Sequence, residues 1–141
     1  MRIEADWWLQ AGNRDMRMAL KLKEVGLYEG TAFHCQQAGE KYLKALLMVV
    51  GSEWQRTHSC VTLLGELQRC GVTVAEGLLT WGRKLDLHYI DSRYPNGVGG
   101  PPEQFYDLAI AEELIEACEA IRTFVEEHLE KEGKEPDEGQ G

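Results

Sequence analysis

Apolar residues recur at helical spacing along most of the chain. In residues 3–25 one stripe consists of Trp8, Gly12, Met16 and Ala19. In residues 28–50 a second stripe consists of Ala32, Cys35, Gly39, Tyr42, Leu46 and Val49. Steps of three and four residues are typical of a helix face that packs against another helix. Gly26 lies where a C-cap is expected, and the short turn predicts that the two helices are antiparallel neighbours.

The same period predicts three further helices. Ser59 is placed to cap a short helix that runs to about residue 70. A fourth helix is expected over residues 74–90 and a fifth over residues 102–130, separated by a Gly- and Pro-rich loop. No stretch shows a convincing strand pattern. The sequence therefore predicts one all-α domain over residues 1–131, an up-and-down bundle of four long helices plus one short helix.

Charge is unevenly distributed along the chain. The formal net charge is −9, and 13 of the 24 acidic residues lie in residues 103–141 with only three basic residues. The acidity therefore belongs to the last predicted helix and to residues 132–141, whose composition predicts a disordered tail. A phosphate backbone is bound by basic surface, so the first two-thirds of the chain could bind nucleic acid only through a local cluster.

Several classes of protein are disfavoured by missing patterns. No stretch is long and apolar enough for a membrane helix, and acids stand where a signal peptide would be apolar, so we expect a cytoplasmic protein with no membrane partner. The histidines and cysteines lack metal-ligand spacing. Neither a phosphate loop nor a nucleophile elbow occurs. The sequence predicts neither a metal nor a cofactor.

A polar ladder lies beside the apolar stripe of residues 28–50. Gln36, Glu40 and Lys44 share one strip of that helix, and Gln37, Lys41 and Lys44 share an adjoining strip. The ladder has two interpretations: a solvated helix face, or a site in which amides contact a base or ribose and lysines neutralise a phosphate.

Two further groups have the same ambiguity. His58 is either a loop residue beside the Ser59 cap or a polar wall of a cleft, where imidazole can exchange a proton near neutrality. Arg93 and Tyr94 either shape the turn, with Arg93 paired to an acid of the last helix, or hold a phosphate and a base.

These segments together resemble the HEPN-domain family. The resemblance rests on Q-Q-A-G-E-K-Y-L-K at residues 36–44, H-S at 58–59, S-R-Y-P at 92–95 and the opening pattern around Trp8, and it covers roughly residues 5–130. Gly12 and His88 depart from it, since Ala and an aromatic residue are usual there. The resemblance implies a helical bundle that forms a homodimer and, in many members, partners a minimal nucleotidyltransferase and binds nucleotide or nucleic acid without catalysis of its own.

The residues expected to supply those contacts are Gln37, Lys41, Lys44, His58, Arg93 and Tyr94. The resemblance also implies an alternative, a metal-independent endoribonuclease of toxin type with an Arg-x(4–6)-His motif, which Arg83 and His88 match. Five residues on a regular helix turn the two side chains roughly 140° apart, at about 100° per residue, so the match is also readily a coincidence. A third interpretation is a pure interaction protein with no nucleotide affinity.

Overall fold

The structure, a computed structural model, describes residues 3–51 and 56–140, and the side chains of all of these except 96–97 and 133–140. Its helices are α1 (Ile3–Glu24), α2 (Tyr28–Val49), α3 (Cys60–Arg69), α4 (Glu76–Asp91), α5 (Pro95–Val98), α6 (Pro102–Phe105) and α7 (Leu108–Gln140). No strand occurs in the described ranges, which confirms the predicted all-α class.

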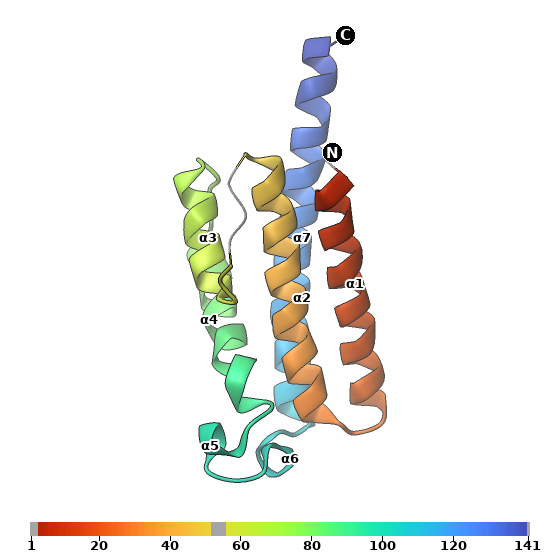
Figure 1. The fold of residues 1–141 in the computed structure, drawn as a ribbon, viewed down its shortest axis with the longest axis vertical. Coiled ribbons are helices and arrows are strands. Elements are labelled where there is room, and N and C mark those ends of the chain that lie inside the picture. The colour runs from red at the N-terminus through yellow and green to blue at the C-terminus, as the bar shows by residue number, and fades with distance from the viewer. Residues whose placement is uncertain (1–2, 52–55, 141) are drawn as a thin grey trace.

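The helix α2 stands at the centre of the bundle. It contacts α1, α3, α4, α6 and α7, with α7 behind it in Figure 1 and with α1 and the α3–α4 pair on opposite sides. The chain runs down α1, up α2, down α4 and up α7, while the short α3 lies beside α2. Thirteen of the 22 residues of α2 are buried, so its polar side chains must find partners inside the protein.

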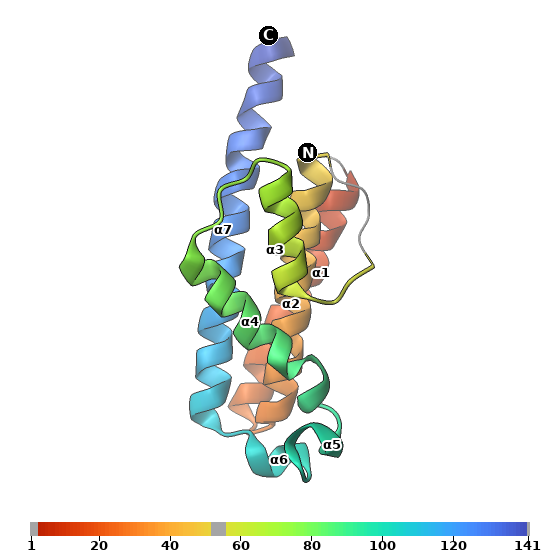
Figure 2. The same cartoon turned by 90° about the vertical axis from the view of Figure 1, so that its left-hand side faces the viewer.

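The core contains most residues of the two stripes that the sequence predicts on α1 and α2, among them Met16, Ala19, Tyr42 and Leu46. Its largest members come from α2, α3, α4 and α7 and include Tyr42, Leu43, Leu46, Leu47, Leu63, Leu64, Leu67, Leu85, Leu114, Ile121 and Val125. The helix α4 crosses obliquely over this core (Figure 2) and buries Leu85 in it. Among the described helices none is both long and apolar enough to cross a bilayer.

The loop before the last helix is more structured than the sequence predicts. It contains the single-turn helices α5 and α6, and the last helix begins at Leu108 rather than near residue 102. Tyr106 is extended and buried, and Asp107 then caps α7 by accepting a hydrogen bond from the backbone N–H of Ile110 at 2.9 Å. Pro102 is thus the first residue of α6, whereas α7 begins after its own N-cap residue, Asp107.

The end of α7 extends past the other helices. The structure continues the helix to Gln140, through residues 132–140, for which composition predicts disorder. This part projects beyond the bundle in Figure 1, where hydrogen bonds within its own backbone provide the helical geometry. The disordered tail stays a prediction.

Contact between α1 and α2 depends on Gly12. A Cβ atom at this position would lie 2.8 Å from Cε1 of Tyr42, whose ring is 1 % exposed and whose hydroxyl donates to Oδ1 of Asn13 at 2.7 Å. The ring therefore fills the space that alanine would need.

We expect Gly12→Ala to lower the free energy of unfolding by about 1–3 kcal/mol through overpacking, despite the better helix propensity of alanine. Gly65→Ala is the matched control, because no atom lies within 4 Å of the added Cβ, and it should raise stability by roughly 0.5–1 kcal/mol. Thermal denaturation measures both. Equal gains for the two variants would show that α1 and α2 are not in such close contact.

Candidate functional site

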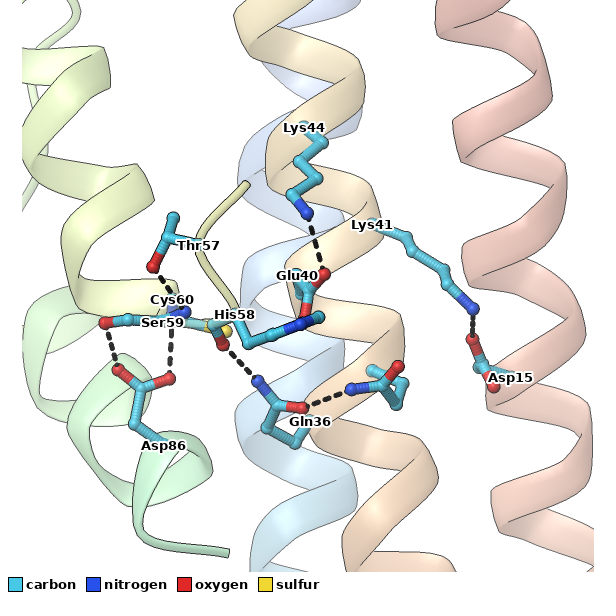
Figure 3. A network of polar contacts seen from close by, with 11 residues as sticks. Asp15, Gln36, Glu40, Lys41, Lys44, Thr57, His58, Ser59, Cys60 and Asp86 are labelled. Carbon is cyan, nitrogen blue, oxygen red and sulfur yellow. Dashed lines mark hydrogen bonds and ion pairs between the residues drawn. The ribbon is translucent and has the colours of Figure 1, made fainter. Parts of the chain in front are cut away.

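Two glutamines connect α2 to the segment before α3. Gln36 is fully buried, and its Nε2 donates to the backbone oxygen of His58 at 2.6 Å. Its Oε1 accepts from Nε2 of Gln37 at 2.7 Å. The carbonyl of His58 can only accept, so it fixes the orientation of both amides. The relay holds the backbone of residue 58 against α2 (Figure 3), and no donor to Oε1 of Gln37 is seen among the described residues.

A buried ion pair lies one turn further along α2. Glu40 is 3 % exposed and Lys44 is 5 % exposed, and Nζ of Lys44 lies 2.8 Å from Oε2 of Glu40. The other oxygen of Glu40 lies 3.1 Å from Nδ1 of His58. Lys44 also lies 5.4 Å from the centre of the Trp8 ring. Its ammonium group is therefore occupied inside the protein rather than presented to a ligand (Figure 3).

Lys41 is held in a second cluster, on the side of α2 that faces α1. Its Nζ lies 2.5 Å from Oδ2 of Asp15, and Nδ1 of His34 lies 2.8 Å from Oδ1 of the same carboxylate. Burial raises the pKa of Asp15, but the hydrogen bonds from His34 and Lys41 outweigh it and hold the pKa below its usual value. Asp15 is therefore ionised at neutral pH and ties α1 to α2.

Asp86 of α4 clamps the start of α3. Its carboxylate accepts from Oγ of Ser59 at 2.8 Å and from the backbone N–H groups of Cys60 at 2.7 Å and Val61 at 3.1 Å. Oγ of Ser59 accepts in turn from the N–H of Thr62 at 3.1 Å, which confirms the predicted cap. The two caps together satisfy the N-terminal donors of α3 and fix the residues that follow His58.

A shallow hollow of ≈320 Å³ opens beside this clamp. Its walls are Thr57, His58, Ser59, Asp86 and Tyr89. The imidazole of His58 stacks on the Tyr89 ring, with 4.8 Å between ring centres and 15° between planes. The His58 side chain is 53 % exposed, so part of this stacked surface faces solvent.

Arg93 lies at the same end of α4. Its guanidinium is 4.6 Å from the ring centre of Phe33, 5.1 Å from that of Tyr89 and 5.2 Å from that of Tyr94. Among the described side chains no carboxylate pairs with it, so the alternative in which Arg93 pairs with an acid of the last helix is not seen there. Arg93 and Tyr94 are both exposed, with 47 % of Tyr94 accessible. The result is an exposed cation supported by aromatic faces.

The predicted site residues thus separate into two groups. Gln37, His58, Arg93 and Tyr94 are linked through contacts with Gln36, Tyr89 and Phe33, whereas Lys41 and Lys44 are bound to carboxylates. Sequence reasoning missed Phe33, Asp86 and Tyr89. The spacing of four from Phe33 to Gln37 and from Tyr89 to Arg93 was a usable signal, since such pairs share a helix face.

Arg83 and His88 make separate contacts on α4. Nη2 of Arg83 lies 3.4 Å from Oε1 of Glu76 at the exposed start of the helix. Nδ1 of His88 lies 2.6 Å from the hydroxyl of Tyr106, and burial lowers the pKa of His88. Arg83 and His88 have no shared partner among the described residues. The described residues also contain no group of His, Cys, Asp and Glu arranged to hold a metal ion.

The Glu40–Lys44 pair provides a test of how the site is supported. Glu40→Leu leaves a buried ammonium without its partner, so we expect a loss of roughly 3–5 kcal/mol in the free energy of unfolding. Glu40→Leu combined with Lys44→Met removes both charges and should recover most of that loss. Urea denaturation measures both variants. A loss below about 1 kcal/mol for Glu40→Leu, the size of a surface ion pair, would contradict the burial described here.

Comparison with known proteins places the whole bundle in one family. The HEPN domain model matches residues 5–128. TT1696 from Thermus thermophilus is 34 % identical, with a TM-score of 0.83 over 88 % of this chain and 97 % of that one. ST0689, an archaeal HEPN homologue, is 32 % identical, with a TM-score of 0.74 over 86 % and 94 %.

A HEPN domain protein from Thermotoga maritima, TM0613, is 29 % identical, with a TM-score of 0.70 over 87 % of this chain and 97 % of that one. No curated protein matches the chain. The family model and the two relatives above 30 % identity agree with the resemblance seen in the sequence, and this chain belongs to the HEPN-domain family.

Proposed function

We propose that this protein is a HEPN-domain module that binds a nucleotide or a short single-stranded nucleic acid. The observation that carries the proposal is Arg93, an exposed guanidinium without a carboxylate partner among the described residues, held against the Phe33, Tyr89 and Tyr94 rings. A guanidinium in this setting binds phosphate oxygens with two parallel N–H donors.

The surroundings of Arg93 fit the other parts of a nucleotide. Exposed faces of His58 and Tyr94 are available for base stacking, which contributes roughly 1–3 kcal/mol per base in single-strand binders. Oε1 of Gln37, which has no donor among the described residues, can accept a hydrogen bond from a base or ribose donor. The hollow beside His58 and Tyr89 is shallow, which suits a flexible strand or a mononucleotide better than a rigid duplex.

The family resemblance extends the proposal to partners. In the extended proposal, the chain forms a homodimer and presents its ligand to a minimal nucleotidyltransferase, with no catalysis of its own. Co-purification of this chain with a nucleotidyltransferase encoded beside it tests the partner, and its elution volume alone tests the dimer.

Arg93→Ala should weaken nucleotide binding at least tenfold, because it removes the cation and one surface of the stacked cluster. Arg83→Ala is the matched control: it removes another exposed arginine of the α4 region, outside the hollow, and should leave affinity unchanged. Fluorescence anisotropy with a labelled oligonucleotide measures both. An equal effect of the two variants would show that general positive charge, and not this site, binds the ligand.

The absence of catalysis has its own test. We expect no cleavage of single-stranded RNA in EDTA, because Arg83 and His88 contact different partners and do not converge. The assay follows a labelled RNA over hours with His88→Ala as control. If the unmodified chain cleaves the RNA and His88→Ala does not, the protein is an endoribonuclease and the proposal of a non-catalytic binding module is wrong.

A further inference from the structure

The charge balance around the hollow limits what the proposed site can hold. The cations predicted to bind phosphate are Lys41 and Lys44 on α2 and Arg93 at the end of α4. Lys41 is paired with Asp15 at 2.5 Å, and Lys44 is paired with Glu40 at 2.8 Å. Their charges are thereby balanced by carboxylates that are themselves buried. Neither ammonium is available to a phosphate unless an internal ion pair breaks, which leaves a buried charge unpaired.

The N-terminus of α3 is another place where a phosphate could find donors, and it is already filled. The carboxylate of Asp86 takes the hydroxyl of Ser59 and the N–H groups of Cys60 and Val61. Backbone donors at a helix start commonly bind phosphate. Here a carboxylate of the same chain occupies them and adds a negative charge to the wall of the hollow.

Arg93 is then the one cation of this set with no carboxylate partner in the described chain. Its planar group has donors for a single phosphoryl group in a bidentate arrangement. His58 stacks on the same Tyr89 ring that Arg93 contacts, so a base on the exposed imidazole would lie next to a phosphate on the guanidinium.

We infer that the site recognises one phosphoryl group attached to a nucleoside, as in a nucleoside monophosphate or one nucleotide unit of a single strand, and that the two further phosphates of a nucleoside triphosphate add no affinity. This inference rests on the proposed function and narrows it. The added phosphates of a triphosphate find no free cation in this set and face the carboxylate of Asp86, so they contribute no affinity.

The test is calorimetric titration of the full chain with AMP and with ATP, in EDTA so that no Mg²⁺ neutralises the phosphates. ATP should bind no more than about threefold tighter than AMP, because each further phosphate–cation contact would add roughly tenfold. Affinity for a short oligonucleotide should fall with salt at a slope near −0.7, the value for about one neutralised phosphate.

The outcomes separate the inference from the proposed function. If ATP binds more than about threefold tighter, the single-phosphate inference is overturned while nucleotide binding stands. If neither AMP, ATP nor the oligonucleotide binds, the proposed function itself is overturned. Arg93→Ala should lower the affinity for AMP and the affinity for ATP by the same factor.

A gain-of-charge variant provides an independent check. Gln37→Lys places a second cation on the strip of α2 that carries Phe33, one turn away, and an ammonium group can replace the amide as donor to Oε1 of Gln36. The ratio of ATP to AMP affinity should rise to roughly tenfold, as for one added phosphate–cation contact. An unchanged ratio would show that the number of available cations does not determine how many phosphates of the ligand contribute to its affinity.

Discussion

The central constraint on this molecule is that α2 is enclosed by other helices and still carries Gln36, Glu40 and Lys44. Each of these groups would be costly to bury without a partner. Each finds one: Gln36 at the backbone of His58, Glu40 and Lys44 in each other, with the His58 ring as the second partner of Glu40. The described side chains contain no buried polar atom without a hydrogen bond.

The hydrogen bonds and the ion pair made by these buried side chains also determine the shape of the surface. Because Gln36 and Glu40 both hold residue 58, a segment with no regular structure of its own is fixed against α2 on one side. Asp86 fixes the following residues against α4 on the other side. The exposed imidazole of His58 is therefore held on the Tyr89 ring, which Arg93 also contacts. Groups that serve stability inside the protein thus pre-organise the groups proposed to bind ligand, which lowers the entropic cost of binding.

The fold was readable from the sequence because its signals are local and repeated. The stripes around Met16 and Leu46, the Ser59 cap and Gly26, which has a positive φ of 78°, each depend on neighbours within a few residues. The site was readable only in part, because charge pairing is a tertiary property. Lys41 and Lys44 look like phosphate ligands in sequence, and only the packing reveals that Asp15 and Glu40 bind them. Asp86 gave no local signal, since the donors it satisfies lie 25–27 residues earlier.

The central claim is that ligand meets this chain at the fixed surface formed by His58, Tyr89 and Arg93. Mapping of NMR chemical shifts on the isotope-labelled protein during addition of AMP tests it most directly. We expect the largest changes to cluster at residues 57–59, 89 and 93–94, with little change at the exposed basic residues Arg14 and Arg17 on α1. Shift changes centred on α1, with the chemical shifts around residue 58 unchanged, would contradict this claim.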